Sequence, residues 1–536
     1  MNLKSIRHPA LSNQSGKTAL ASRLPIGLAT VLALIAGMVF SLSLAPYYLW
    51  PVAIFSVMVL YALLVNEDSP VRAFWLGQLY GFGTWVVGAS WLYHSIHEYG
   101  SIPSWIAAIM IVVMAMIMGL FQAFFAWAFV RFVGRQPLAF ASLWVFQEWL
   151  KTWLFSGFPW LFVGYAFTEQ SWLTGFAPVL GVFGVSFMAV LFSASLVELF
   201  RQNLRFFVLS ALVLMLNAAL SWVDWTWQKP NDRLSVSLVQ GNIPQDLKWL
   251  TQYRERTLKI YADLSSNEWG RDVIIWPEAA IPMFHDEAAP FINRIANQAL
   301  AKESAWVTGL MYRDFEQYDA SKDSYPPIYN SAAAIDRHGI SLYKKQHLVP
   351  FGEYIPFSGL FNILPNLANM QSMRSISAGD ANQTPLMVKG RSVGVAICYE
   401  VAYPDTTRHN AKDAEVLLTI SNDAWFGTTA GPWQHLQMVQ MRSLETGRYF
   451  IRATNTGITA IINHKGKIQN IVPQFERTVL QGEVPMMMGV TPFVRFGNYP
   501  ILGLSVLLFL CSLMARQNQS ASSATQKYYT ANGVRD

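Results

Sequence analysis

The chain has 536 residues, which is more than one ordinary domain needs and enough for a large buried core. Apolar residues make up 53% of it and charged residues only 13%, about half the charged share of typical soluble proteins. This composition excludes an ordinary soluble protein and predicts a membrane protein, while the net charge of +6 does not indicate a nucleic-acid partner, because the basic residues form no continuous stripe.

Eight apolar stretches are candidates for membrane spans, since a helical crossing needs about 20 mostly apolar residues. The first runs apolar for too long to be a cleaved signal peptide, and the second is the shortest. The predicted spans are 24–44, 49–65, 73–93, 104–130, 137–155, 173–199, 206–223 and 499–515.

Lysine and arginine set the predicted orientation, because cytoplasmic loops carry their excess. They gather in both termini and in alternate connections, and the opposite connections hold only Lys151. Seven crossings therefore carry the chain outside, and an eighth returns it. The predicted divisions are a cytoplasmic tail at 1–23, a membrane domain at 24–223, an extracytoplasmic catalytic domain at 224–497, an eighth span at 498–515 and a cytoplasmic tail at 516–536.

Some polar residues lie in or near the predicted spans. Glu148 and Lys151 are three residues apart, so they can pair on one helical face, and charges inside a membrane are candidates for function. The alternative is an interfacial pair in which the lysine reaches toward water. His94 and His97 have helical spacing but no third ligand, so we expect no metal site there.

From about residue 233, short β-rich runs alternate with more polar helical stretches, which predicts a layered α/β domain. Three of these runs end in chemically active side chains. DVIIWPEAAIP places Glu278 beyond a strand, ISLYKKQHLVPFGEYIP places Lys344 and Lys345, and SVGVAICYE places Cys398. Active sites favour such strand ends, but these residues are far apart in sequence, so only the fold could bring them together.

An acid, an ammonium and a thiol suffice for acyl transfer through a thioester. The carboxylate takes the thiol proton, and the ammonium stabilises both the thiolate and the oxygen of a tetrahedral intermediate. A buried structural role is the alternative for Cys398. However, an oxidising outer compartment endangers an unpaired thiol, and this domain has no second cysteine. The other cysteine, Cys511, lies in the last span, where packing is expected.

The segments WPEAAIP, KKQHLVPFGEYIP and AICYE resemble the Glu–Lys–Cys signature of the nitrilase, or carbon–nitrogen hydrolase, superfamily. Together with the spans, the segment HLVPFGEYIP narrows the resemblance to the apolipoprotein N-acyltransferase family of the bacterial envelope, over essentially the whole chain. This resemblance implies a nitrilase-like αββα sandwich on an eight-helix transmembrane domain. It also implies an inner-membrane protein with its catalytic domain in the periplasm, and no cofactor or metal.

By position, the resemblance makes Glu278 the general base, Lys345 the oxyanion-stabilising lysine and Cys398 the nucleophile. Lys345 is preferred to Lys344 because the lysine of the family stands two residues before a histidine, here His347. The resemblance also makes Glu353 and Glu400 further acids of the site. Its remaining assignments are substrate-binding residues, namely Trp249, Tyr399, Asn422 and Trp425. Ordinary packing is the alternative for the aromatic residues among them.

The resemblance also implies the substrates. Cys398 would take an acyl chain from a phospholipid, with phosphatidylethanolamine as the expected donor, and pass it to the N-terminal S-diacylglyceryl-cysteine of an apolipoprotein. This would be the last step of bacterial lipoprotein maturation, performed by a monomer with ping-pong kinetics. The apolar stretch 357–373 is predicted to cover the acyl chain or dip into lipid, with a buried helix as the alternative.

Two other functions remain open at this point. A membrane-anchored amidase or nitrile hydrolase could use the same three side chains and pass the acyl group to water. A transporter or scaffold could carry an outer domain that only binds ligand, although the spans lack the broken, charged helices expected of a transporter.

Overall fold

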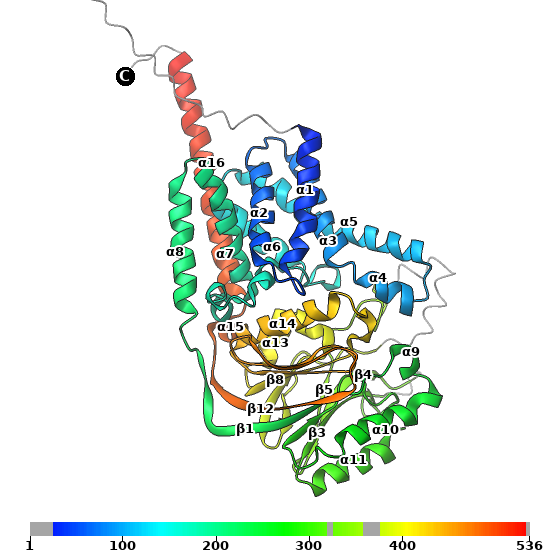
Figure 1. The fold of residues 1–536 in the computed structure, drawn as a ribbon. Helices are drawn as coiled ribbons and strands as arrows, with labels where there is room; N and C mark the ends of the chain where they lie inside the picture. The colour runs from blue at the N-terminus through cyan, green and yellow to red at the C-terminus, as the bar shows by residue number, and fades with distance from the viewer. Residues whose placement is uncertain (1–24, 319–324, 357–375, 532–536) are drawn as a thin grey trace, which may run out of the picture.

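The structure is a computed structural model, and it describes residues 25–318, 325–356 and 376–531. A helical part lies at one end of the molecule and a part with two β-sheets at the other (Figure 1). The stretch 357–373, predicted to cover the acyl chain, falls outside the described residues.

A helix lies in each of the eight predicted spans. Four helical segments are long and apolar enough to cross a membrane unaided, namely Ile26–Ser43, Ser104–Val133, Ala177–Phe200 and Tyr499–Asn518. The other four helices are shorter or less apolar, so the full number of crossings stays a prediction. The helices are α1 (Ile26–Phe40), α2 (Trp50–Val65), α3 (Pro70–Gly88), α5 (Ser104–Ala128), α6 (Pro137–Leu150), α7 (Ala177–Phe200), α8 (Leu204–Leu220) and α16 (Tyr499–Ala531).

Helix α3 packs closely between α1 and α5 because glycines allow the backbones to approach. A Cβ atom on Gly37 of α1 would lie 2.0 Å from the backbone oxygen of Tyr80, and one on Gly77 would lie 2.3 Å from that of Gln122. Small residues at such crossings are typical of helices packed within a membrane, where van der Waals contact drives association.

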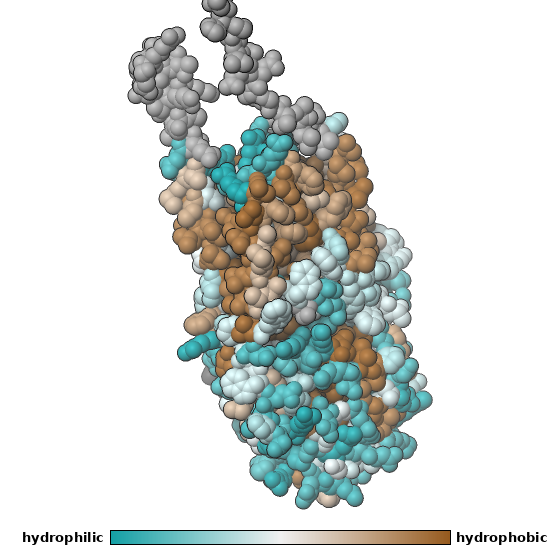
Figure 2. All heavy atoms as spheres, turned by 60° about the vertical axis from the view of Figure 1, so that its left-hand side comes forward, coloured by the Kyte–Doolittle hydropathy of each residue, from teal (hydrophilic) through white to brown (hydrophobic). Residues whose placement is uncertain are grey.

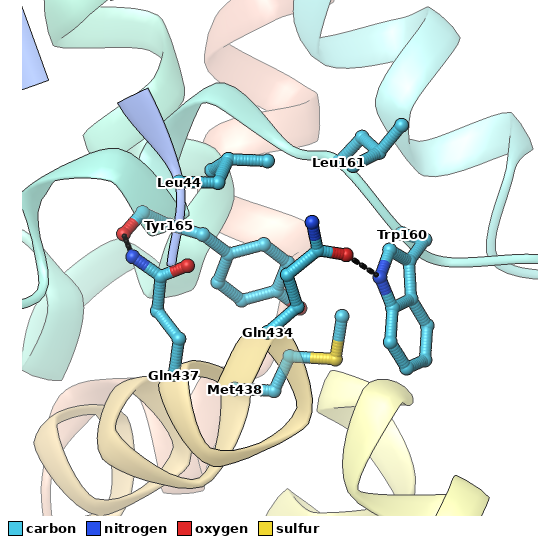
Figure 3. A pocket seen from close by; sticks show the side chains of 7 residues that line it. All are labelled: Leu44, Trp160, Leu161, Tyr165, Gln434, Gln437 and Met438. Carbon is cyan, nitrogen blue, oxygen red and sulfur yellow. Dashed lines mark hydrogen bonds between the residues drawn. The ribbon is translucent and has the colours of Figure 1, made fainter. Parts of the chain in front are cut away.

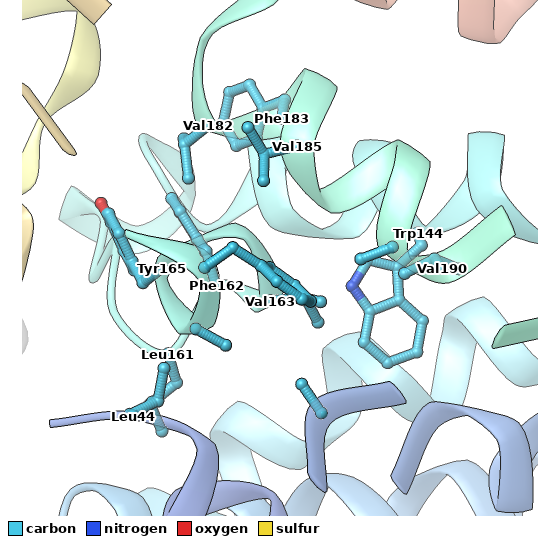
Figure 4. Packing of buried hydrophobic residues seen from close by; sticks show 14 of the residues in the cluster. Leu44, Trp144, Leu161, Phe162, Val163, Tyr165, Val182, Phe183, Val185 and Val190 are labelled. Atoms are coloured by element: carbon cyan, nitrogen blue, oxygen red, sulfur yellow. The ribbon is translucent and has the colours of Figure 1, made fainter. Parts of the chain in front are cut away.

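Helix α6 is short because the chain after it turns inward. Its 14 residues rise only about 21 Å, less than the hydrocarbon core of a bilayer. The irregular segment after α6 is exposed at Trp153 and Phe155, and residues 159–168 then lie buried inside the helical part, where Phe162 and Tyr165 pack against α7 (Figure 4). Irregular backbone at this depth needs internal partners, and Glu148 supplies one by accepting a 2.9 Å hydrogen bond from the Val163 amide.

The interpretation of Lys151 as a lysine that reaches toward water is wrong. Its side chain is only 1% exposed. The ammonium lies 5.6 Å from the ring centroid of Trp85 and 5.3 Å from that of Phe162. Cation–π contact with these rings takes the place of hydration.

On the face shown in Figure 2, apolar side chains cover much of the helical part and hydrophilic ones cover most of the sheet part. Large exposed residues of the helices include Phe55, Trp75 and Met116. A continuous apolar surface of this size is typical of a face covered by lipid.

The other part is an αββα sandwich, which confirms the predicted layering. Its sheets have the orders β12-β1-β2-β3-β4-β5 and β11-β10-β9-β8-β7-β6. Their central strands are parallel and every residue of β2 and β8 is buried, which explains the continuous apolar runs in the sequence. The strands are β1 (Thr226–Gln240), β2 (Val273–Ile275), β3 (Ala305–Arg313), β4 (Ile328–Asp336), β5 (Gly339–Lys344), β6 (Leu386–Val388), β7 (Arg391–Val395), β8 (Val416–Ser421), β9 (Phe450–Thr454), β10 (Thr459–Ile462), β11 (Ile468–Val472) and β12 (Thr478–Gly489).

Helices cover both outer faces of the sandwich. On the first sheet lie α10 (Arg254–Ser265) and α11 (Ala289–Ala301), and on the second lie α13 (Pro404–Asn410) and α14 (Gly431–Thr446). Helix α14 also packs against α7, so it separates the second sheet from the helical part (Figure 1).

Helix α14 is polar in sequence, yet all of its residues except Trp433 are buried. The carboxamide of Gln434 accepts hydrogen bonds from the indoles of Trp91 and Trp160 at 3.1 and 2.7 Å. Gln437 accepts from the Ala45 amide and donates to the Tyr165 carbonyl (Figure 3). These side chains therefore join the sandwich to the helical part through directed hydrogen bonds.

Replacing Gln434 by leucine should destabilise this junction, because two buried indole N–H groups would lose their acceptor. The expected cost is about 2–5 kcal/mol. Thermal unfolding of the detergent-solubilised protein should show a lower midpoint for Gln434→Leu. The exposed Gln469→Leu is the matched control and should leave the midpoint nearly unchanged. Equal midpoints for both variants would contradict the assigned role of Gln434.

Candidate active site

Each of the three predicted reactive residues follows the end of a strand. Glu278 is the third residue after β2, Lys345 directly follows β5, and Cys398 is the third residue after β7. The first two strands belong to one sheet and β7 to the other, so the site draws on both layers of the sandwich. Lys345 Nζ lies 3.4 Å from Glu278 Oε1, and both charges lie near enough to affect the pKa of the Cys398 thiol.

Two acids share the Lys345 ammonium. Its Nζ atom lies 2.9 Å from Glu353 Oε1 and 3.4 Å from Glu278 Oε1, and the side chain is only 1% exposed. Burial alone would lower the pKa of Lys345, but Glu353 and Glu278 more than offset this and raise it above its ordinary value. The lysine therefore carries a fixed positive charge at neutral pH.

Asn330 links the same two acids, and the sequence analysis missed it. Its Nδ2 donates to Glu278 Oε1 at 2.7 Å and to Glu353 Oε1 at 3.0 Å. The signal was an amide in the mostly apolar run of β4, where a buried polar group needs partners.

The Cys398 thiol is protonated at rest. Burial raises the pKa of the thiol and the charge of Glu278 adds to this, while Lys345 and a hydrogen bond with Ser421 oppose it. The residue nevertheless keeps partial exposure to solvent. A protonated thiol needs a base before it can act as a nucleophile, and the nearby Glu278 carboxylate can serve as that base.

The backbone at Cys398 is in a conformation that non-glycine residues rarely adopt. Its φ angle is +51°, and the short 3₁₀ helix Cys398–Ala402 begins there. The Cys398 carbonyl accepts a 2.9 Å hydrogen bond from Nε2 of His435, a residue of α14 that the sequence analysis also missed. The chain therefore makes an elbow at Cys398, directly after β7 and its two following residues.

Glu400, one of the predicted further acids, is fully buried and engaged by backbone groups. Its carboxylate accepts from the amides of Gln346 and His347, which follow Lys345. It also accepts from the amide of Ile397, which precedes Cys398. Burial raises the pKa of Glu400 to about 7, although these amides lower it. Geometrically, this carboxylate fixes the lysine segment and the cysteine segment relative to each other.

The four predicted substrate-binding residues do not share one environment. The backbone amide of Asn422 donates to Glu278 Oε2 at 2.8 Å, so this residue belongs to the acid cluster. The Tyr399 hydroxyl donates to the Gly157 carbonyl of the helical part. Trp249 and Trp425 are 45% and 42% exposed, so they stand at the surface.

A second buried lysine lies beside the acid cluster and was also missed. Lys248 is fully buried at the end of α9 (Gln245–Lys248), and its Nζ donates to the Glu278 carbonyl at 3.1 Å. Burial lowers the pKa of Lys248 to about 8, while Glu278 and Cys398 act to raise it. In the sequence, Lys248 is only a lysine beside Trp249. A lysine at an exposed helix end would give the same pattern. Within the described part of the chain, no cluster of His, Cys, Asp and Glu side chains is suited to a metal ion.

Two protein-family models match the chain. One is the apolipoprotein N-acyltransferase N-terminal domain, over residues 36–195, and the other is the carbon-nitrogen hydrolase family, over residues 235–491. The chain is 39% identical over 504 residues to a protein of Azotobacter vinelandii named apolipoprotein N-acyltransferase, covering 92% of this chain and 96% of that one. A protein of the same name from Pseudomonas syringae pv. tomato is 38% identical over 496 residues, covering 90% and 96%.

Among solved structures, the nitrilase-superfamily member Nit3 of Saccharomyces cerevisiae aligns with 47% of this chain and 90% of its own. The two are 17% identical, with a TM-score of 0.36.

The Glu400→Gln variant tests whether this acid holds the two segments together. An amide would present N–H groups to backbone amides that now bind a carboxylate, at an expected cost of about 2–4 kcal/mol. The midpoint of thermal unfolding should fall by about 5–10 °C. Glu483→Gln, on the exposed side of β12, is the control and should change little. An unchanged midpoint for Glu400→Gln would show that the carboxylate is not needed for the fold.

Proposed function

The chain belongs to the apolipoprotein N-acyltransferase family, and from that premise we propose that it transfers an acyl chain from a phospholipid to the N-terminal amine of a lipoprotein. The observation that carries the proposal is the Cys398 thiol within electrostatic reach of Glu278 and Lys345, in a sandwich joined to apolar helices by α14. Both substrates keep their acyl chains in the bilayer, so a site beside membrane helices suits them.

In the first half-reaction, Glu278 accepts the thiol proton and the sulfur attacks the ester carbonyl of a phospholipid. Lys345 stabilises the negative oxygen of the tetrahedral intermediate. When the carbon–oxygen bond breaks, Glu278 returns its proton to the departing lysophospholipid hydroxyl. The products are a thioester on Cys398 and a carboxylate on Glu278, as at the start.

In the second half-reaction, the α-amine of an S-diacylglyceryl-cysteine attacks the thioester. Glu278 accepts a proton from the amine as the amine attacks. When the carbon–sulfur bond breaks, the departing thiolate of Cys398 takes this proton from Glu278. The product is an amide-linked acyl chain on the lipoprotein. Phosphatidylethanolamine is the proposed donor, and the two halves give ping-pong kinetics with the enzyme acting as a monomer.

We place the catalytic domain in the periplasm, with eight crossings of the bacterial inner membrane and both termini in the cytoplasm. The excess of lysine and arginine at alternate helix ends supports this orientation. Arg516 of α16 donates to the backbone oxygens of Val130 and Arg131, so two chain segments predicted to be cytoplasmic lie together, as this orientation requires.

The acyl-enzyme can be detected by intact mass. The full chain in detergent, incubated with phosphatidylethanolamine alone, should gain the mass of one acyl chain, and Cys398→Ala should gain none. A diacylglyceryl lipopeptide should discharge the adduct, and water should do so much more slowly. Rapid release of free fatty acid without lipopeptide would instead support the hydrolase alternative, and a protein that only bound lipid would show no adduct.

Reporter fusions test the orientation. Alkaline phosphatase fused after Asp224 should be active, because folding of the reporter needs the periplasm. The same reporter fused after Asp536 should be inactive, and green fluorescent protein at that position should fluoresce. Reversed activities at the two positions would contradict the proposed orientation.

A further inference from the structure

A buried network connects Cys398 to an aspartate that the proposed reaction does not use. Asp423 lies two residues after β8 and is only 1% exposed. Its carboxylate accepts from the Ser421 hydroxyl at 2.7 Å and lies 3.1 Å from Nδ1 of His435. Arg452 of β9 forms a short ion pair with the other carboxylate oxygen.

One arm of this network reaches Cys398. His435 donates from Nε2 to the Cys398 carbonyl at 2.9 Å, so it holds the backbone of the elbow. Nδ1 of the same ring lies 3.1 Å from Asp423, which ties this arm to the second sheet.

The charge of Asp423 makes the network rigid. Burial alone would raise the pKa of Asp423, but Arg452 and His435 hold it well below its ordinary range. The carboxylate is thus ionised at all physiological pH values; it accepts from Ser421 and Arg452, and it lies 3.1 Å from Nδ1 of His435. Hydrogen bonds to a buried charged acceptor are stronger than neutral ones and fix their donors more firmly.

The elbow needs such support. A left-handed φ at a non-glycine residue costs about 1–2 kcal/mol, and it persists only where surrounding contacts determine it. The His435 hydrogen bond is made by the carbonyl of the strained residue itself. His435 also lies on α14, beside Gln434, so the helix that binds the membrane part carries the group that holds the elbow.

We propose that Asp423 and His435 are positioning residues, which hold the Cys398 elbow so that its sulfur faces Glu278 and Lys345. Neither residue exchanges a proton or a bond in the reaction. Their effect on acyl transfer rests on the proposed function, but their effect on the thiol does not. The charged groups facing that thiol are Glu278, Lys345, Asp423 and Lys248.

The test uses the full chain carrying Cys511→Ala, so that Cys398 is the remaining cysteine. His435→Leu removes the hydrogen bond to the Cys398 carbonyl, and His435→Gln keeps an amide donor there. Asp423→Asn removes the charge beside His435 and keeps the shape of the side chain. His464→Leu, a half-buried histidine of the same domain that stacks on Tyr449, is the matched control.

Two rates are measured for each variant. One is the formation of the acyl-enzyme with phosphatidylethanolamine, and the other is alkylation of the thiol by iodoacetamide across pH 6–10. In His435→Leu, acylation should fall about 100-fold at saturating lipid, since small displacements of a reacting atom have effects of this size. Alkylation at pH 8 should rise about threefold or more, because a released thiol loses the burial that disfavours its ionised form. His435→Gln should recover much of the acylation rate, and His464→Leu should match the parent.

Opposite changes in the two rates, at an unchanged midpoint of thermal unfolding, support positioning. Parent rates of both reactions in His435→Leu, or equal loss in the leucine and glutamine variants, would overturn it. If His435→Leu does not fold, Asp423→Asn decides: faster alkylation with slower acylation supports the proposal, and parent rates overturn it. An enzyme that alkylates normally but never forms an acyl adduct would instead refute the proposed function.

Discussion

The buried polar helix α14 is the constraint on which the arrangement of the molecule depends. An apolar contact between the sandwich and the membrane helices would stabilise many relative positions, because hydrophobic attraction has little directionality. The carboxamides of Gln434 and Gln437 instead bind indoles and backbone groups with fixed geometry. Their partners are buried, so a shifted arrangement would leave polar groups unsatisfied. The sandwich therefore has one position relative to the helices. The elbow at Cys398, which belongs to the sandwich, is held at one distance from the helical part.

The layered fold could be predicted from the sequence because parallel buried strands have an unmistakable pattern. The run that becomes β2 is apolar throughout, and the run that becomes β8 is apolar at four of its six positions. Strand ends could also be located, which is why Glu278, Lys345 and Cys398 were identified before the fold was known. Their convergence could not be predicted from spacing, since it depends on the order of strands in two sheets and on how those sheets face each other.

Residues that act through partners on distant segments could not be predicted in the same way. A polar helix such as α14 is typical of a solvent-exposed layer, and nothing in its own sequence indicates a second surface above it. Asn330 binds Glu278 and Glu353, which are distant from it in sequence. Asp423 contacts His435 of α14, and only the fold brings the two together. The membrane part shows the same limit. The apolar stretches of the sequence were enough to predict where the helices lie. The inward course of the chain after α6 depends instead on contacts such as the one between Glu148 and Val163.

The shared lysine explains why the site holds two acids. In the proposed reaction Glu278 becomes neutral when it takes the thiol proton, and a lysine paired only with that acid would lose its counter-charge in a buried site. Here Glu353 lies closer to Lys345 than Glu278 does, at 2.9 against 3.4 Å, so the ammonium keeps a partner throughout. Asn330 holds both carboxylates in place during the change. The lysine can therefore remain in position for the oxyanion while the proton moves, and the second acid makes this possible without reacting itself.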